Sequence, residues 1–432
     1  MDFIYGPEEK PPLGYSLSSG MQWAAVLISY VIILGVVVST LHYSTPSEEV
    51  YYIQKLLLVT AFAVVLQVIA GHRLPVIFGP ATVLLIGILS SQAFSTDAIY
   101  SSILIGGILG VIAGSTGLLI HISRLFTERV VTVVLLLVVF TMIPTITDLL
   151  TGVNSGTGAG PLESFIFSLI LIMSIFAANR FLKGFFQTTL LLWVIVFGTI
   201  IYALIFPFEF TLVSGLPDTG ILTGFTKAIV IEPGVLISFI ICYFALLIND
   251  IGSIKGIGEV LGDTNMEGRF RRGVVATGVV NIISGISGVI GGVNYSTSAG
   301  IILDSKCASK WTLIPAAGFL VVAGLVPQIT SLMAQIPTPV IGCLLIYVMA
   351  AMFSASMHVF FKSENKPVFD FDSGIIVGLP VILGAITSTI PHEITASFPG
   401  ILQPVISNGF VIGVIAVILM EHLIYSKKGD KN

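Results

Sequence analysis

The stretch that decides the fold reads GGVNYSTSAGIILDSKCASKW and runs from Gly291 to Trp311. It is too polar to cross a lipid bilayer as an ordinary helix, because a crossing helix needs about 20 predominantly apolar residues. Long apolar segments nevertheless flank it closely. Non-helical backbone at membrane depth is tolerated only where protein or a water-filled cavity surrounds it. The stretch is therefore predicted to line a central cavity near the middle of a membrane.

The composition supports the membrane setting. Of the 432 residues, 55% are hydrophobic and only 10% are charged, and the mean hydropathy is +1.03. Soluble globular proteins carry about 25% charged residues, so the chain is predicted to be an integral membrane protein in contact with the lipid bilayer. The net charge of −4 and the lack of a basic patch with interleaved aromatics exclude nucleic acid as a partner. The first twenty residues contain no apolar run, so no cleaved signal peptide is expected.

No pattern of catalytic or metal-binding residues is visible. The three cysteines, Cys242, Cys307 and Cys343, are far apart and follow no metal spacing, so they read as small core residues. The sequence also lacks a Ser-His-Asp set and a phosphate loop. The chain is therefore predicted not to be an enzyme, with no catalytic residue, no metal and no cofactor.

Apolar runs divide the chain into fourteen predicted spans. They lie near 18–40, 50–70, 74–92, 99–121, 129–150, 162–182, 186–207, 234–262, 270–291, 293–305, 311–334, 338–361, 372–390 and 405–426. Seven spans precede the longest connection and seven follow it, so the two halves have opposite orientations, as in inverted-repeat transporters. The predicted organisation is an all-α polytopic protein, with an N-terminus at 1–17, a first repeat at 18–207, a connecting loop at 208–233, a second repeat at 234–426 and a tail at 427–432.

Loop charges predict the orientation. Lys and Arg gather in the connections after even-numbered spans and in the C-terminal tail, and the clear exception is Lys227. Cytoplasmic loops carry an excess of these residues, so both termini are predicted to be cytoplasmic in a multi-pass protein of the cell (plasma or inner) membrane.

Spans three and ten hold corresponding positions in the two halves, and both are interrupted. The third reads LPVIFGPATVLLIGI, with Pro75, Gly79 and Pro80, and the tenth is the opening stretch. Paired irregular segments are a pointer to a transport site. A half-helix beginning there would direct its N-terminal N–H groups at partial negative charge, either a nucleobase carbonyl or an anion. The alternative is a pair of kinked helices packed on small residues.

Span eight reads CYFALLINDIGSIKGIGEV and contains Asn249 and Asp250. Ionisable residues inside spans are costly and are functional candidates by default. Asp250 is the only acid well inside a predicted span of the second half, and a carboxylate facing a cavity can carry a proton between two conformations. The alternative is that it pairs near the cytoplasmic end with Lys255 or an Arg of the next connection. Gln22 in span one and Thr82 in span three are weaker candidates for the same site.

Several stretches together resemble one family, the nucleobase–cation symporters of the uracil/xanthine/ascorbate permease group. The resemblance covers nearly the whole chain and is most specific from Arg269 to Trp311. It rests on YGPEEKPPL at the N-terminus, GMQW in span one, GHRLPVIFGP entering span three, RFRRGVVATGVVNIISGISGVIGG as span nine, and Tyr295-Ser296-Thr297-Ser298-Ala299-Gly300, which is similar to the family signature Tyr-Ser-Glu-Asn-x-Gly. It implies seven-plus-seven inverted repeats, short extended segments in spans three and ten, a core domain that holds substrate, a gate domain and often a homodimer.

The departures from the family pattern concern the site. The glutamate of the tenth span falls on Thr297, that of the eighth span falls on Asn249, and the aromatic of the third span falls on Thr82. A nucleobase presents adjacent N–H donors and carbonyl acceptors, and a buried site discriminates strongly because unpaired polar groups are expensive. The predicted substrate-binding residues can bond to such a ligand only neutrally; they are Gln22, Thr82, Asn249, Tyr295, Ser296, Thr297 and Ser298.

The leading hypothesis is a secondary transporter of a small nucleobase-like heterocycle, coupled to a proton or another cation, with Asp250 as the proton-coupling residue. A small-anion transporter or exchanger of the same fold is the alternative, because a carboxylate would repel an anion and neutral half-helix ends would not. A channel would need a continuous polar pore, whereas the polar residues cluster in spans three, eight and ten only.

Overall fold

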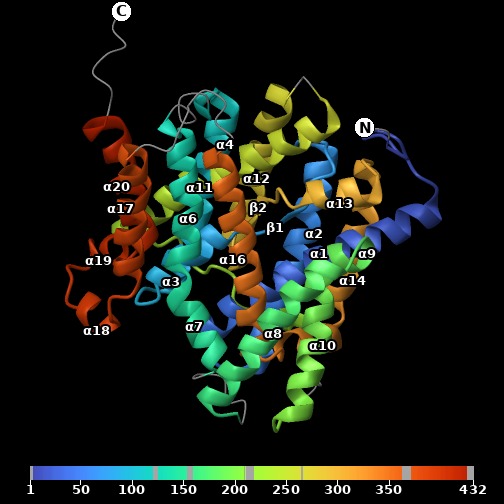
Figure 1. The fold of residues 1–432 in the computed structure, drawn as a ribbon, viewed down its shortest axis with the longest axis horizontal. Helices are drawn as coiled ribbons and strands as arrows, with labels where there is room; N and C mark the ends of the chain where they lie inside the picture. The colour runs from blue at the N-terminus through green and yellow to red at the C-terminus, as the bar shows by residue number, and fades with distance from the viewer. Residues whose placement is uncertain are drawn as a thin grey trace, which may run out of the picture.

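The computed structural model describes residues 3–119, 125–152, 159–208, 210, 218–263, 266–361 and 371–425. The predicted tail 427–432 lies outside these ranges. The chain is mostly helical, with two very short strands that meet in its interior (Figure 1).

The first half of the chain contains one strand and a series of helices of very different lengths. They are α1 (Leu13–His42), α2 (Pro46–Ile69), β1 (Phe78–Pro80), α3 (Thr82–Ser90), α4 (Thr96–Thr116), α6 (Glu128–Thr141), α7 (Ile143–Thr151), α8 (Pro161–Phe181), α9 (Phe185–Thr188) and α10 (Leu190–Ile205).

The second half again places one short strand among its helices. The elements are η1 (Asp218–Leu222), α11 (Pro233–Leu261), α12 (Met266–Ser287), β2 (Gly292–Asn294), α13 (Ser298–Ser305), η2 (Lys310–Thr312), α14 (Leu313–Leu325), α15 (Pro327–Ala334), α16 (Thr338–Phe361), α17 (Phe371–Ser388), α18 (His392–Thr395), α19 (Gln403–Ile406), α20 (Gly409–Leu419) and η3 (Met420–Ile424).

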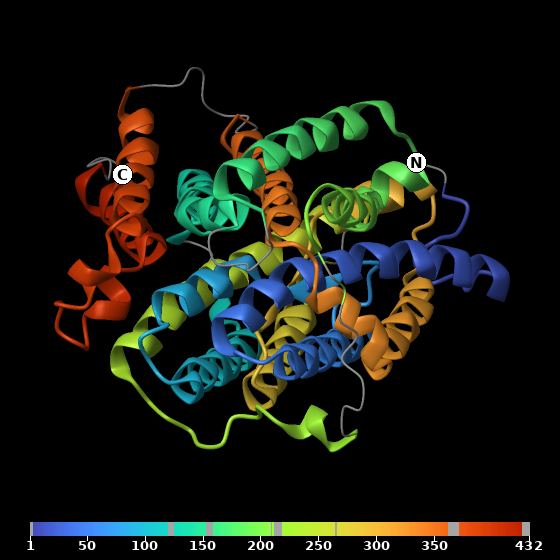
Figure 2. The ribbon, with the colours of Figure 1, turned by 90° about the horizontal axis from the view of Figure 1, so that it is seen from below.

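By length and composition, eight of the described helices could each cross a membrane. The pair 310–325 and 327–334, which is bent by 84°, makes a ninth if it is one span, and two shorter apolar helices cover Leu190–Ile205 and Gly409–Ile424. These helices confirm a polytopic membrane protein. In Figure 2 the blue α1 runs through the middle and the red C-terminal helices lie at one edge.

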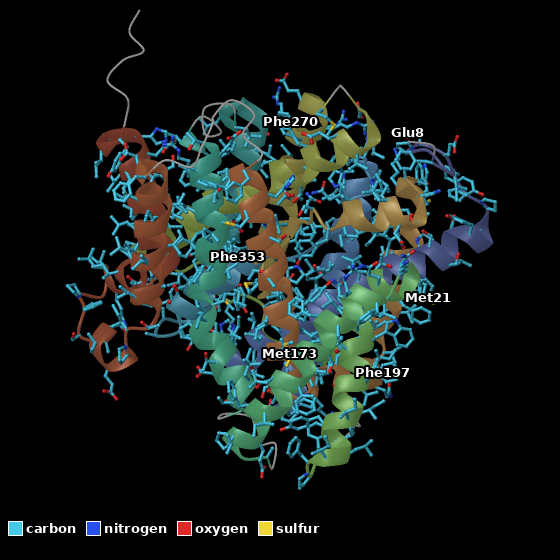
Figure 3. The ribbon with its side chains drawn as sticks, viewed as in Figure 1. Glu8, Met21, Met173, Phe197, Phe270 and Phe353 are labelled. Carbon is cyan, nitrogen blue, oxygen red and sulfur yellow. The ribbon has the colours of Figure 1, made fainter. Side chains whose placement is uncertain are left out.

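Large apolar side chains cover the outer helices. Met173 on α8, Phe197 on α10 and Phe353 on α16, which are labelled in Figure 3, are 70%, 54% and 42% exposed. On a soluble monomer apolar patches of this kind are rare, but lipid tails are as apolar as the side chains themselves. These faces therefore suit contact with lipid.

The two interrupted stretches pair with each other. β1 and β2 run antiparallel, with Phe78 opposite Asn294 and Pro80 opposite Gly292. A Cβ at Gly292 would lie 2.3 Å from the Phe78 ring and 2.7 Å from a backbone oxygen. Only glycine therefore fits at this strand crossing, the point where β1 and β2 pair. The predicted extended segments in both stretches are therefore confirmed, and the alternative of two kinked helices is wrong.

Glycines also allow the close packing of α4 against α12. A Cβ at Gly107 would lie 2.8 Å from the Gly278 carbonyl oxygen, and a Cβ at Gly278 would lie 2.7 Å from the Gly107 carbonyl oxygen. Small residues let helix backbones approach in membranes, where association depends on van der Waals packing rather than on the hydrophobic effect. This packing gives α12 a fixed position beside the strand pair.

Candidate functional site

Two half-helices begin at the strand crossing. The Ala81 N–H donates to the Gly291 carbonyl and the Tyr295 N–H donates to the Ile77 carbonyl, each at 2.9 Å. Immediately beyond the strands α3 starts at Thr82 and α13 at Ser298. α11 packs against α3, β2 and α13, so it runs alongside this crossing. The crossing thus brings residues of predicted spans three, eight and ten together.

Tyr295 is fixed at the crossing by three contacts. Its backbone N–H bonds to β1 as above, its hydroxyl donates to the Pro80 carbonyl, and its ring lies against the ring of Tyr30 with centroids 4.5 Å apart and planes at 41°. Tyr30, on α1, also contacts Thr297. Sequence reasoning missed Tyr30, although a lone tyrosine in the middle of a long apolar helix is a visible signal.

The predicted polar residues differ in their surroundings. Ser298 is buried, with its Oγ donating to the Tyr295 carbonyl at 2.7 Å and accepting from the Ile77 N–H at 3.0 Å, so its bonding is structural. Thr82 and Asn249 are half-buried and Ser296 is exposed. In the described part of the chain, the side chains of these last three residues donate and accept no hydrogen bond. They remain able to bond to a ligand.

Gln22 lies elsewhere on α1. Its Nε2 donates to the Thr188 Oγ1 at 2.7 Å and so ties α1 to α9, which also contacts α13. It is eight positions from Tyr30, about 12 Å along a helix axis. The structure therefore places Gln22 between helices and does not bring it beside the Tyr30 ring.

Asp250 is fully buried on α11 and accepts three hydrogen bonds. Its Oδ1 accepts from the Asn294 backbone N–H at 3.0 Å and from the Asn294 Nδ2 at 2.7 Å, and its Oδ2 accepts from the Thr277 Oγ1 at 2.8 Å. Within the described ranges no ion pair involves it. The alternative in which Asp250 pairs with a lysine or arginine is therefore not what the structure contains.

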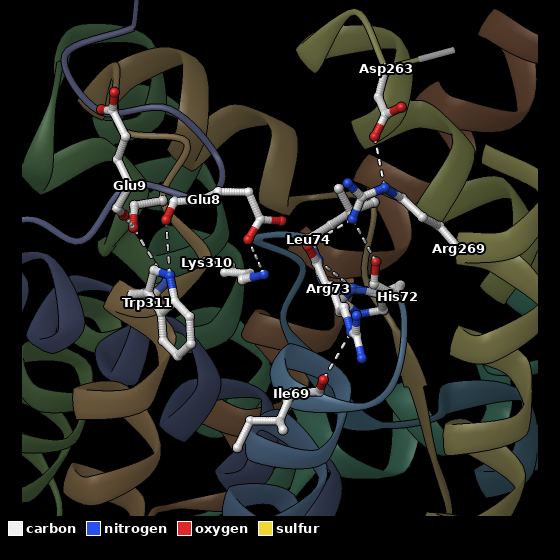
Figure 4. Close-up of polar contacts among 11 residues, drawn as sticks. Glu8, Glu9, Ile69, His72, Arg73, Leu74, Asp263, Arg269, Lys310 and Trp311 are labelled. Carbon is white, nitrogen blue, oxygen red and sulfur yellow. Dashed lines mark hydrogen bonds and ion pairs between the residues drawn. The ribbon is translucent and has the colours of Figure 1, made fainter. Parts of the chain in front are cut away.

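Two of the cations considered in that alternative, Arg269 and Lys255, lie against other groups. Arg269 pairs with Asp263 at 2.7 Å and donates to the carbonyls of His72 and Arg73, both at 3.1 Å (Figure 4). The Lys255 Nζ lies 5.5 Å from the centre of the Phe270 ring. Arg269 thus fastens α12 to the turn that follows α2.

Four further residues that sequence reasoning missed extend the hydrogen bonds of Asp250. His72 Nε2 lies 3.1 Å from Asn294 Oδ1, and Gln67 Nε2 donates to Thr277 Oγ1 at 3.0 Å. His72, Gln67, Thr277 and Asn294 are all buried. A polar residue in an apolar span is a visible signal, but its partner cannot be read from the sequence when more than 200 positions separate the two.

A cavity of about 1100 Å³ lies between two groups of helices. Residues of α1, α2 and α3 line one side, and residues of α6, α7 and the stretch from Ser388 to Gly409 line the other. Its polar lining includes Glu49, Asp148 and Asn408. None of the seven predicted substrate residues lines it, and its nearest member on α3, Ile86, stands one helical turn, about 6 Å, beyond Thr82.

Comparisons with known proteins agree on one family. A family model described as a permease family, of xanthine and uracil permeases, matches residues 14–393. The uric acid permease PucJ of Bacillus subtilis is 24% identical over 398 residues, covering 89% of this chain and 87% of the relative. The nucleobase transporter PlUacP of Paenibacillus larvae is 25% identical over 430 residues, covering 96% of each chain.

Solved structures share the fold at low sequence identity. The transmembrane domain of the cyanobacterial bicarbonate transporter BicA matches with a TM-score of 0.64 and 15% identity, covering 89% of this chain and 98% of that one. The murine anion transporter Slc26a9 matches with a TM-score of 0.62 and 10% identity, covering 95% of this chain and 69% of that one. The likeness to these two proteins extends to the fold alone.

Proposed function

Because the chain belongs to the permease family of xanthine and uracil permeases, we propose that it moves a nucleobase-like heterocycle of the uracil, xanthine or purine class across the cell membrane by alternating access. The observation that carries the proposal is a group of neutral polar side chains at the crossing of two half-helices. The names of the relatives, a uric acid permease and a nucleobase transporter, support the same substrate class.

The chemistry of these side chains suits a heterocycle. The Asn249 amide both donates and accepts, and the hydroxyls of Ser296 and Thr297 do the same, so a ring that presents N–H and carbonyl groups can bond to all three. Thr82 supplies no ring, and we assign the stacking face to Tyr30, which lies beside Thr297. Tyr295 and Ser298 stabilise the backbone of the site, and Gln22 supports the site through its bond to α9.

The same proposal includes the finer architecture. It has fourteen spans as seven-plus-seven inverted repeats, residues 1–17 and 427–432 in the cytoplasm, and a homodimer. The core domain comprises α1 to α4 and α11 to α15, and the gate domain comprises α6 to α10 and α16 to α20. The cavity of about 1100 Å³ between these groups serves as the outer access path to the site. Transport is coupled to a proton or another cation, with Asp250 as the titrating group.

A thermal-shift screen on purified protein tests the substrate class. Ligands that bind only the folded state raise its melting temperature. We expect uric acid, xanthine or uracil to raise it, with bicarbonate and sulfate inert. A shift with the anions alone would overturn the heterocycle proposal and favour the alternative, an anion transporter. That alternative is supported by the neutral character of the proposed contacts Thr82, Asn249, Ser296 and Thr297.

A single substitution tests the site. Thr297→Ala should weaken binding about fivefold, because a neutral hydrogen bond is worth about 1 kcal/mol. Thr387→Ala is the control, since the Thr387 hydroxyl is exposed and donates to the Leu383 carbonyl of its own helix. Equal dissociation constants for the wild type and Thr297→Ala would rule out a direct contact.

A further inference from the structure

A chain of hydrogen bonds joins Asp250 to the segment that carries the proposed substrate contacts. Asn294 is its middle member, since the residue meets Asp250 Oδ1 through both its backbone N–H and its side-chain Nδ2, at 3.0 and 2.7 Å. The next residue is Tyr295, and Ser296 and Thr297 follow. Any movement of Asn294 is therefore transmitted directly to the backbone of the site.

The donors in this chain have a defined direction. The Leu74 N–H donates to His72 Nδ1 at 3.0 Å, so Nδ1 is an acceptor and the ring proton sits on Nε2. Nε2 then donates to Asn294 Oδ1 at 3.1 Å, which leaves the Asn294 Nδ2 hydrogens for Asp250. Both bonds at Asp250 Oδ1 come from N–H donors, and with the Thr277 hydroxyl as the donor at Oδ2 the group accepts only, as an ionised carboxylate does.

The same contacts can accommodate a proton on Asp250. A protonated Oδ2 would donate to the Thr277 hydroxyl, which would turn to the Gly273 carbonyl one turn back along α12, a common partner for a helical threonine. That carbonyl is within reach of the group, since Gln67 Nε2 donates to it at 3.1 Å. Protonation would, however, remove the charge that Asn294 bonds to, and charge-assisted hydrogen bonds are about twice as strong as neutral ones.

Other charges near Asp250 are few. Among the residues that the structure describes on α2, α3, α4, α11, α12 and the strand pair, the titratable or charged groups hydrogen-bonded to this chain are His72 and Arg269, and Arg269 reaches it only through the His72 carbonyl. No cation compensates the carboxylate directly. Its proton occupancy therefore bears mainly on its bonds to Asn294 and Thr277.

We propose that Asn294 is a positioning residue that links the protonation of Asp250 to the placement of the binding segment Tyr295 to Thr297. This inference rests on the proposed function, because it explains how a carboxylate without substrate contact can couple proton and substrate. Symport requires that proton and substrate favour the same conformation, and linkage then makes each raise the affinity for the other by the same factor. Substrate should therefore bind more tightly to the protein with Asp250 protonated.

The test measures the dissociation constant of xanthine or uric acid at about pH 5 and about pH 8 for four proteins. The wild type should bind about fivefold or more tightly at the lower pH, a typical coupling. Asp250→Asn, which resembles the protonated acid, should bind equally at both values. Asn294→Ser, whose side chain is too short to bond to either Asp250 or His72, should lose most of the pH dependence.

Asn281→Ser is the matched control. Asn281 also holds β2, with its Oδ1 accepting from the Gly292 N–H at 2.6 Å and its Nδ2 donating to the Gly292 carbonyl at 3.2 Å, but it makes no contact with Asp250. This variant should bind the heterocycle more weakly at both pH values, and the ratio of its dissociation constants at about pH 8 and about pH 5 should equal that of the wild type. Loss of the ratio here as well would reduce Asn294 to a general structural role and overturn the inference.

Each remaining outcome is also decisive. A wild-type pH ratio in Asn294→Ser would overturn the inference, and if that variant does not fold, an unchanged ratio in the nearly isosteric Asp250→Asn would do the same. A wild type that binds a heterocycle without pH dependence would overturn the inference and leave the proposed function intact. A wild type that binds no heterocycle would overturn the proposed function itself.

Discussion

Replacing Thr277 by valine removes one hydroxyl from the buried centre of the protein and nearly preserves the side-chain shape. Thr277 is 1% exposed, donates to Asp250 Oδ2 at 2.8 Å and accepts from Gln67 Nε2 at 3.0 Å. Gln67 keeps a second acceptor, the Gly273 carbonyl, so its amide is not left without a partner. The bond to Asp250 is the main loss, and a hydrogen bond to a charged group contributes about 1.5–3 kcal/mol. Thr277→Val should therefore destabilise the folded protein by about that amount.

Two further variants isolate the hydroxyl. Thr199→Val is the control, since the buried Thr199 Oγ1 meets no hydrogen-bond partner in the described structure, and its removal should leave stability unchanged or raise it. Thr277→Ser keeps the hydroxyl and loses one methyl group, at a cost of about 1 kcal/mol. Thermal unfolding in detergent should thus rank Thr277→Val lowest. Equal melting temperatures for the two valine variants would refute the reasoning.

Three further outcomes are expected. Gly107→Ala places a Cβ 2.7 Å from a backbone nitrogen of α12 and should lower the free energy of unfolding by about 1–3 kcal/mol. The Cβ of Gly110→Ala meets nothing closer than 3.5 Å, so this variant should be neutral or stabilising. A rise in melting temperature for both variants would contradict the α4–α12 packing. Leu222→Cys, at a site 67% exposed, should react with an impermeant thiol reagent outside intact cells, and Leu125→Cys only after permeabilisation; the reverse pattern would invert the topology. Glu8→Gln removes the charge that pairs with Lys310, whose side chain is only 6% exposed, so it should cost more than the roughly 1 kcal/mol of a fully exposed pair. A smaller loss in thermal unfolding would mean that this lysine does not depend on Glu8.

The sequence was sufficient for the membrane class, the family and the two interrupted segments. Each of these depends on local composition: a run of apolar residues, a motif, or prolines and glycines that stop a helix. Pro80 and Gly292 interrupt their stretches visibly, and the structure pairs them in one two-stranded sheet. The pairing agrees with the prediction that paired irregular segments meet at a transport site.

The partners of individual polar groups were not predictable. Asn249 and Asp250 are adjacent in the sequence, yet Asp250 is saturated by bonds from β2 and α12, whereas the Asn249 side chain makes none within the described ranges. The helix turns by about 100° per residue, so neighbours face different surroundings. Gln22 shows the same limit, because its bond to Thr188 depends on where a short helix distant in sequence packs.

The placement of Asp250, the one buried carboxylate among the residues that the structure describes, bears on how this protein differs from the family pattern. In that pattern acids occupy the positions of Asn249 and Thr297, where they would meet the ligand. Here the acid at membrane depth is Asp250, whose oxygens are both covered by Asn294 and Thr277. A carboxylate shielded in this way cannot discriminate between ligands by direct contact, so recognition would depend on the neutral groups and on Tyr30. The charge would act on transport through β2 and α12, the two elements that it bonds to. Substitutions at Thr297 should therefore change which ligand binds, and substitutions at Asn294 should change how binding responds to protons.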